Sequence, residues 1–272
     1  MPPSLRLQRV AKSAALVSGR LTGRRAGLVV LLYHRVGAGE RNIDLSTETF
    51  RRQMASLAEH CEVVPLSEGL RRAGDPGLDR DLVSITFDDG TADLYEHAFP
   101  ILAGFGLPAT LYLATGPCEE GLPFPSWATG TIDAPALGWD QVNQMLDSDL
   151  ITIGSHTHTH ADLDVVDGAT IREELRRSKE LIEDRTGRAC LDFAYPHAVT
   201  SSEAEAAVRR TYATATVAGW KKNRAGRIDP YRITRTPVTR ADGPVFFRAK
   251  RAGRMAPEAM LYRMGGTRRA ER

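Results

Sequence analysis

The sequence is poor in cysteine and contains no long apolar run. Its three cysteines, Cys61, Cys118 and Cys190, are widely spaced and form no CxxC pair, which excludes a disulfide framework and a cysteine-rich zinc site. We expect buried thiols at these positions. No stretch reaches the roughly 18 apolar residues that a membrane-spanning helix requires. Hydrophobic residues fill 42% of the 272 positions, enough for the core of one barrel-sized domain.

Charge is unevenly distributed along the chain, although the net charge is only +2. Residues 1–25 carry six basic and no acidic side chains, and residues 240–272 carry nine basic and three acidic ones. The segment between them, 26–239, has 21 basic and 31 acidic side chains, a net charge of −10. We therefore expect a basic amphipathic N-terminal segment at 1–25, one catalytic domain at 26–239 and a basic C-terminal tail at 240–272.

The two basic ends predict either solvated tails or contact with an anionic membrane surface. The longest apolar stretch of the first segment, Ala14 to Val17, is shorter than the core of a secretion signal. A cytoplasmic or peripheral membrane location is therefore our expectation, with an extracytoplasmic one left open. Two apolar runs, Phe246 to Phe247 and Met260 to Tyr262, favour packing or membrane contact for the tail. We expect no nucleic-acid partner, and the oligomeric state is not indicated.

Short apolar runs alternate with amphipathic helical patterns along residues 26–239. Such alternation predicts a single (β/α) barrel of about seven parallel strands. The clearest helix pattern covers about Thr170 to Arg185, with a capping box from Thr170 to Glu173. The candidate strands are Gly27–His34, Cys61–Leu66, Leu82–Asp89, Ala109–Gly116, Ile151–His156, Leu191–Pro196, Tyr212–Gly219 and Tyr231–Val238.

The run from Leu82 to Gly90 ends in two adjacent carboxylates, Asp88 and Asp89, and two histidines spaced i, i+4 follow at His156 and His160. Burying two unpaired charges is costly, so the carboxylates are expected to have a chemical role. Two imidazoles and one carboxylate form a three-ligand set that leaves positions open on Zn²⁺ or a similar divalent ion. One aspartate would then bind the metal while the other takes a proton from water. The sequence alone does not decide which aspartate binds the metal and which one takes the proton.

These residues resemble the motifs of the polysaccharide deacetylase family, the NodB-homology or carbohydrate esterase 4 group. Thr86 to Gly90 matches its TFDDG motif, and His156 to His160 matches H(S/T)xxH. Phe193 to Pro196 and Leu31 to Val36 are similar to the FAYP and YHxV elements of its exopolysaccharide subgroup. The resemblance covers about Gly27 to Val238. It implies a distorted barrel of the NodB type and removal of N-acetyl groups from an N-acetylhexosamine polysaccharide, with carbohydrate as partner.

The resemblance also implies roles for individual residues. Asp88 would be the catalytic base, and the backbone N–H of Tyr195 would help to hold the oxyanion. His34, the histidine of the YHxV element, would be the general acid, with His197 as the alternative. One divalent ion, Zn²⁺ or else Co²⁺, Ni²⁺ or Fe²⁺, would be held by Asp89, His156 and His160.

Two departures from the family pattern bear on this assignment. Ala194 stands where several members place an arginine that orients the base, so we expect the base to lack that partner. The C-terminal LxH motif, which supplies the acid in many members, is missing.

Trp127, Trp139 and His197 are candidates for substrate binding, although Trp139 fits a core position equally well. His158, the middle histidine of the triplet, could exchange roles with His156.

Three alternative functions remain open. Two histidines and one carboxylate also form the facial triad of non-haem Fe(II) oxygenases, although the α/β alternation argues against that class. An amidase acting on a small or lipid-linked amide would use the same chemistry. A catalytically inactive carbohydrate-binding homologue would explain Ala194 but leaves Asp88 without a purpose.

Overall fold

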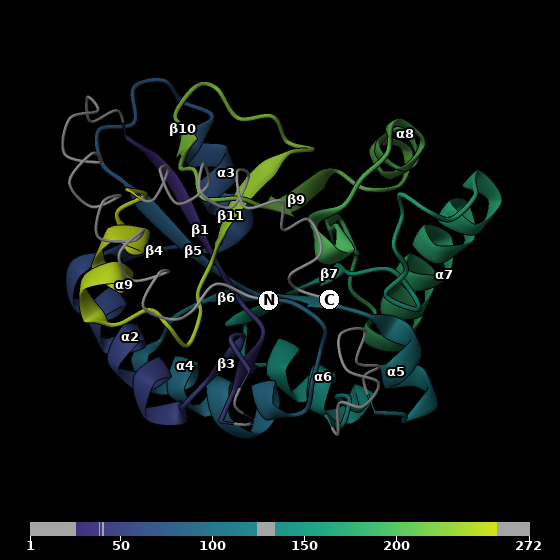
Figure 1. The fold of residues 1–272 in the computed structure, drawn as a ribbon, viewed down its shortest axis with the longest axis horizontal. Helices are drawn as coiled ribbons and strands as arrows, with labels where there is room; N and C mark the ends of the chain where they lie inside the picture. The colour runs from purple at the N-terminus through teal and green to yellow at the C-terminus, as the bar shows by residue number, and fades with distance from the viewer. Residues whose placement is uncertain (1–25, 38, 40, 124–133, 255–272) are drawn as a thin grey trace, which may run out of the picture.

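A closed barrel of seven parallel strands forms the centre of the molecule (Figure 1). The computed structural model describes residues 26–37, 39, 41–123 and 134–254. The ring closes because the first barrel strand pairs with both the second and the last in chain order. This confirms the predicted fold. The strands are β1 (Gly27–Tyr33), β5 (Leu82–Phe87), β6 (Ala109–Leu113), β7 (Ile151–Ser155), β8 (Asp192–Ala194), β9 (Thr214–Ala218) and β11 (Ile233–Pro237).

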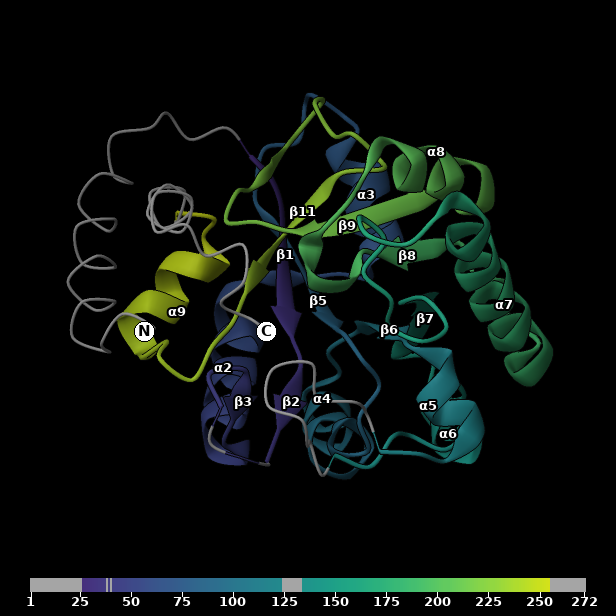
Figure 2. The same ribbon diagram turned by 45° about the vertical axis from the view of Figure 1, so that its right-hand side comes forward.

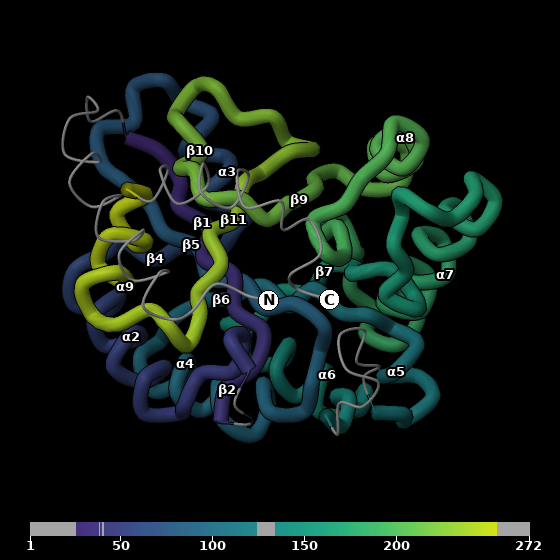
Figure 3. The backbone as a smooth tube through the Cα atoms, viewed as in Figure 1, coloured from purple at the N-terminus to yellow at the C-terminus, as the bar shows by residue number. Residues whose placement is uncertain are grey.

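The register brings the carboxyl ends of these strands to one mouth of the barrel. Tyr33 pairs with Phe87 across β1 and β5, and Leu113 pairs with Ser155 across β6 and β7. The residues that follow each strand therefore meet at the same edge, where barrel enzymes place their sites. Figure 3 shows that β1 and β11, far apart in the sequence, lie side by side.

Helices surround the barrel on its outside, and α7 and α8 lie next to each other along one side (Figures 1 and 2). The predicted helix near Thr170 is α7, which begins at Gly168. Its N-cap is Asp167, whose side chain accepts from the Thr170 N–H, so the predicted capping box was wrong. The helices are α2 (Thr47–His60), α3 (Leu66–Ala73), α4 (Phe99–Phe105), α5 (Thr115–Glu120), α6 (Trp139–Leu146), α7 (Gly168–Thr186), α8 (Ser202–Thr211) and α9 (Pro244–Arg251), with a π-helical turn at Leu94–Ala98 and a short turn at Pro196–Ala198.

In the part of the chain that the structure describes, four short strands lie outside the ring. The run from Cys61 to Leu66, predicted as a strand, contributes only β4 (Glu62–Val63), which pairs in parallel with β5. β10 (Asn223–Arg224) runs antiparallel to β1. β2 (Arg35–Val36) and β3 (Asp44–Leu45) pair with each other directly after β1.

The barrel strands are buried on both faces, which explains why they read as continuous apolar runs. Alternate residues of β1 separate into two groups. Val29 and Leu31 belong to the core shared with Phe50 on α2, whereas Leu28 and Val30 pack with Tyr112, Ala194 and Ile233 from other barrel strands. Cys118 and Cys190 are buried as expected, and Cys61 is half-buried.

The described part of the C-terminal segment, from residue 240 to residue 254, packs against the barrel. Helix α9 contacts α2 and β1, and Phe247 is 3% exposed. Lys250 is buried and donates to Asp242 at 2.7 Å and to the Pro237 carbonyl at 2.6 Å. The folded body therefore includes α9. Within the described ranges no helix combines the length and apolar character needed to cross a bilayer; segment 1–25 and Met260 to Tyr262 lie outside those ranges.

Candidate active site

The two carboxylates sit on a sharp turn that follows β5. Asp89 and Gly90 both have positive φ, 74° and 92°. A Cβ on Gly90 would lie 2.3 Å from the Leu113 Cδ1, so only glycine fits there. The Asp88 N–H donates to the Tyr33 carbonyl and the Ala114 N–H donates to the Asp89 carbonyl. This turn is tied to the strands on both sides and presents two neighbouring carboxylates at the barrel mouth.

Asp89, His156 and His160 come together as a three-residue cluster with metal-ligand geometry. Their ligand atoms all lie within 4.8 Å of one another. The Asp89 Oδ1 is 3.7 Å from the His156 Nε2 and 3.4 Å from the His160 Nε2. Metal bonds of about 2.1 Å at tetrahedral angles would separate ligand atoms by about 3.4 Å. The residues present therefore fit one divalent metal ion.

The surroundings of His156 favour the neutral ring that a metal ligand must have. Its Nδ1 lies 2.8 Å from the Ala194 carbonyl oxygen, a contact that places the proton on Nδ1 and leaves Nε2 for the metal. Burial lowers the pKa of His156 to about 4 against the opposing charge of Asp88. The imidazole is thus uncharged at neutral pH and Nε2 can donate its lone pair.

His158 does not share in this cluster. Its Nδ1 lies 2.9 Å from the Thr115 Oγ1, at the start of α5. This interaction holds the ring beside α5, whereas its two neighbours in the triplet face Asp89. The structure therefore brings together the pair His156 and His160, as predicted, rather than a pair that includes His158.

Asp88 has an arginine partner, so the expectation of an unpartnered base was wrong. Arg235 on β11 donates from both terminal nitrogens to the two carboxylate oxygens of Asp88, at 2.5 and 2.7 Å. Both side chains are buried, and the guanidinium also lies over the Tyr112 ring. A cation in the middle of an otherwise buried strand needs an acidic partner. That signal in Ile233–Pro237 could have identified Arg235 from the sequence.

The electrostatics keep both carboxylates ionised. Burial alone would raise the pKa of Asp88, but the charges of Arg235, His156 and His34 and the hydrogen bonds from Arg235 together outweigh it, and the pKa falls below its ordinary value. For Asp89, burial is outweighed by the hydrogen bond with His160 and by the charge of His34, and its pKa is also lowered. Asp88 is therefore a charged acceptor 3.8 Å from the His156 Nε2, beside the metal-ligand cluster.

His34 follows β1 and faces the same site. Its charge contributes to lowering the pKa of both Asp88 and Asp89, which places the ring near the two carboxylates. The Nδ1 of His34 is buried and has no hydrogen-bond partner among the described residues. His34 thus follows β1, the strand that pairs with β5, and lies within electrostatic range of the predicted base.

The backbone N–H of Tyr195 does not point into the site. It donates to the Thr216 carbonyl at 3.1 Å, as part of the pairing between β8 and β9. A donor committed to the sheet cannot also hold an oxyanion, so the structure contradicts that part of the prediction. The Tyr195 ring belongs to the core and packs edge-on against Phe193.

His197 lies against the metal-ligand cluster on the side of His160. The two ring centroids are 4.6 Å apart in an edge-to-face contact, and the His197 Nδ1 is 2.5 Å from the Asp162 Oδ1. His197 and Ala198 both have positive φ, 52° and 56°, a conformation that non-glycine residues adopt mainly where the surroundings enforce it. His197 is therefore at the mouth, as expected, and Asp162 fixes its ring.

The two tryptophan candidates have different outcomes. Trp139 is the first residue of α6, packs against the main core and donates from Nε1 to Glu119 at 2.7 Å. These contacts favour the core alternative over sugar stacking. Trp127 lies outside the described residues.

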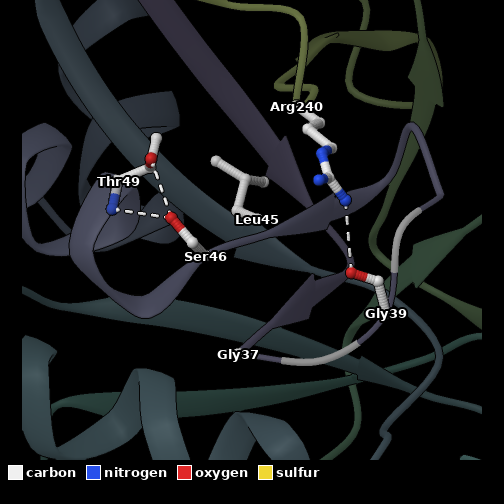
Figure 4. A pocket seen from close by; sticks show the side chains of 6 residues that line it. All are labelled: Gly37, Gly39, Leu45, Ser46, Thr49 and Arg240. Atoms are coloured by element: carbon white, nitrogen blue, oxygen red, sulfur yellow. Dashed lines mark hydrogen bonds between the residues drawn. The ribbon is translucent and has the colours of Figure 1, made fainter.

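A separate groove of about 360 Å³ opens near β2 and β3 (Figure 4). Arg240, which follows β11, lines it and donates to the Gly39 carbonyl at 3.3 Å. Ser46 and Thr49 at the start of α2 form the opposite wall, with their side chains bonded to each other. None of the predicted site residues lines this groove.

The family pattern described as Polysaccharide deacetylase matches residues 76–215, about half of the chain. The chain belongs to the polysaccharide deacetylase family. The matched segment includes Asp88, Asp89, His156 and His160, and it excludes His34 and Arg235. The matched segment therefore contains the whole carboxylate and histidine cluster.

Curated relatives match parts of the chain. The putative polysaccharide deacetylase YxkH of Bacillus subtilis is 24% identical over 192 residues, which cover 70% of this chain and 63% of that protein. The poly-beta-1,6-N-acetyl-D-glucosamine N-deacetylase of Escherichia coli K12 is 30% identical over 144 residues, 48% of this chain and 20% of that enzyme. The chain therefore spans less than two thirds of the length of either relative.

Solved structures share the fold over most of the chain. IcaB from Ammonifex degensii superposes with a TM-score of 0.71 at 25% identity, covering 85% of this chain and 98% of that one. The Streptococcus pyogenes deacetylase PplD, in complex with acetate, gives a TM-score of 0.69 at 20% identity and covers 88% and 98% of the two chains. These similarities agree with the seven-stranded barrel described above.

Proposed function

We propose that this protein is a metal-dependent hydrolase that removes N-acetyl groups from an N-acetylhexosamine polysaccharide or oligosaccharide and releases acetate. The observation that carries the proposal is the second carboxylate. Asp88 is buried, ionised and clamped by Arg235 directly beside the Asp89, His156 and His160 cluster. A site that only bound carbohydrate or metal would not need a second, separately braced carboxylate at that place.

In this proposal Asp89, His156 and His160 hold one divalent ion, and the mixed nitrogen and oxygen donors suit Zn²⁺ or a neighbouring transition metal. When bound, the ion would lower the pKa of water and polarise the acetamide carbonyl. Asp88 takes the proton from the attacking water. Arg235 keeps Asp88 ionised and in fixed orientation, so the base is ready without first having to lose a proton.

His34 is the proposed general acid. Hydrolysis breaks the bond between the acetyl carbon and the sugar nitrogen, and the nitrogen must gain a proton to leave as an amine. His34 approaches the carboxylates from β1 and carries no hydrogen bond on Nδ1 to a described residue, whereas His197 is bound to Asp162. The bond to Asp162 leaves the Nε2 of His197 as the rival proton donor, and variants of the two histidines distinguish them. The products are acetate and a free amino sugar.

The names of the relatives support an exopolysaccharide substrate. Deacetylases of poly-beta-1,6-N-acetyl-D-glucosamine from E. coli and Staphylococcus aureus are among the matched proteins. We infer a β-1,6-linked N-acetylglucosamine chain as the first substrate to test. Other linkages, and a small or lipid-linked amide, are the alternatives that the same panel examines.

The test is acetate release by zinc-loaded protein from N-acetylglucosamine oligomers with β-1,6 and β-1,4 linkages and from simple acetamides. The proposal predicts release from the β-1,6 oligomers and none from simple acetamides. Release only from acetamides would replace the polysaccharide substrate by a small amide. Tight binding of oligomers by calorimetry without any acetate would indicate a binding protein and would contradict the proposed activity.

A further inference from the structure

The loop that carries the two histidine ligands has an unusual backbone. Thr157 and His160 are non-glycine residues with positive φ, 67° and 62°, within a segment of five residues. Such conformations persist only where surrounding contacts fix them. Contacts from the helices on either side of the loop hold these residues in place.

Glu174 provides a clamp from outside the barrel. It lies on α7 and is 8% exposed. Its Oε2 accepts the backbone N–H groups of both His158 and Thr159, each at 2.8 Å, and its Oε1 accepts the Thr159 hydroxyl at 2.8 Å. One carboxylate thus satisfies three donors from two of the three residues that lie between the histidine ligands.

The opposite side of the loop is held by the start of α5. The Gly116 N–H donates to the His158 carbonyl at 2.7 Å, and the Thr115 N–H donates to the Thr157 carbonyl at 3.3 Å. A Cβ on Gly116 would lie 2.8 Å from that His158 carbonyl oxygen, which shows how closely the two segments approach. The loop is therefore held by hydrogen bonds on both sides, from α5 on one and to the Glu174 carboxylate of α7 on the other.

We propose that Glu174 is a positioning residue that sets the separation of the His156 and His160 Nε2 atoms and so determines metal affinity. The inference rests on the proposed function, in which these histidines bind the metal. Glu174 itself contacts neither ligand ring. It acts on them through the backbone N–H groups that its Oε2 accepts, and without it Thr157 and His160 can relax away from their left-handed conformations.

Three substitutions at this position make the proposal quantitative. Glu174→Ala removes all three hydrogen bonds. Glu174→Asp keeps the charge but shortens the side chain by one methylene, so it cannot reach both N–H groups. Glu174→Gln keeps the reach, because its amide oxygen can accept from both N–H groups and its NH₂ can donate to the Thr159 hydroxyl oxygen. Glu173→Ala is the matched control, since Glu173 is exposed on the same helix and bonds to Arg176.

The experiment measures zinc affinity by competition with a chromophoric chelator, together with the thermal midpoint of each metal-free protein. We expect Glu174→Ala and Glu174→Asp to bind zinc about 10- to 100-fold more weakly, the usual effect of losing an outer-shell contact. Glu174→Gln should lie within about fivefold of wild type, and Glu173→Ala should be unchanged. Wild-type affinity in a folded Glu174→Ala or Glu174→Asp protein would overturn the proposal.

The outcomes separate this inference from the proposed function. A wild-type protein that binds no zinc would contradict the proposed metal site as a whole. A wild type that binds zinc, with variants that bind equally well but melt at lower temperature, would leave the function intact and reduce Glu174 to a purely structural role. If Glu174→Ala does not fold, the comparison of Glu174→Asp with Glu174→Gln decides the question, because both retain polar contacts to the loop.

Discussion

Replacing Arg235 by methionine is the substitution that tests the site most sharply. Arg235 and Asp88 are almost fully buried, with side chains 1% and 4% exposed. Removing the guanidinium leaves a buried carboxylate without its bidentate partner, a change that typically costs about 3–5 kcal/mol. We therefore expect Arg235→Met to lower the free energy of unfolding by about that amount at neutral pH, measured by urea denaturation of the metal-free protein.

The loss of stability caused by Arg235→Met should depend on pH in a direction that follows from the pKa of Asp88. In the wild type the folded-state pKa of Asp88 is lowered, so its contribution to stability is present above the unfolded-state pKa and is lost as pH falls through the folded one. Without Arg235, burial raises the folded-state pKa of Asp88, and the carboxyl then gains a proton more readily in the folded protein. The difference between the variant and the wild type should therefore shrink as pH falls towards about 4.

Two further variants complete this test. Asp88→Asn in the Arg235→Met background removes the unpaired charge and should restore a large part of the lost stability. Arg232→Met is the matched control, because Arg232 pairs with Glu205 at the surface, where such pairs contribute at most about 1 kcal/mol. An Arg235→Met protein within about 0.5 kcal/mol of wild type at all pH values would refute the proposed electrostatic role of Arg235.

Three other predictions address the acid, the metal ligands and the β5 turn. His34→Gln should lower kcat for acetate release about 10²- to 10⁴-fold without loss of zinc, and an equal or larger loss in His197→Gln would make His197 the acid. The metal-free protein should lose stability as pH falls from about 6.5 towards 4. Burial lowers the pKa of His156 to about 4 in the folded protein, so the unfolded chain binds that proton first. A urea denaturation midpoint that stays constant across this pH range would contradict the prediction. Gly90→Ala should destabilise the folded protein by about 1–3 kcal/mol, because Gly90 has a positive φ and its Cβ would approach Leu113. Gly104→Ala in α4 should be neutral or stabilising, because a Cβ there meets nothing within 4 Å.

The sequence was sufficient for the parts of the fold that repeat a local pattern. Strands buried on both faces give apolar runs, so the barrel strands could be located from Gly27 to Val238, and the residues after them could be placed at one mouth. A cluster of His156, His160 and one of the two adjacent aspartates could be predicted from the spacing, and the family resemblance selected Asp89 as the ligand. Their coming together required only the parallel register that the alternation already implied.

The errors concern contacts that no local pattern determines. Arg235 reaches Asp88 across 147 positions of sequence, and the motif comparison directed attention to Ala194 instead. The amide of Tyr195 was assigned to an oxyanion because sequence does not show which backbone groups the β8 and β9 pairing uses. The basic charge of residues 240–272 likewise does not show that Lys250 is buried against Asp242. In each case the contact is with a residue that the local sequence pattern does not indicate.

The division of labour between the two adjacent carboxylates is the central claim, and a paired measurement of zinc content and acetate release tests it directly. Asp88→Asn should retain one zinc ion per chain and release no acetate, because it loses the base and keeps Asp89, His156 and His160. Asp89→Asn should lose both zinc and activity. If Asp88→Asn loses the metal while Asp89→Asn keeps it, or if either variant remains fully active, the proposed roles of the two carboxylates are wrong.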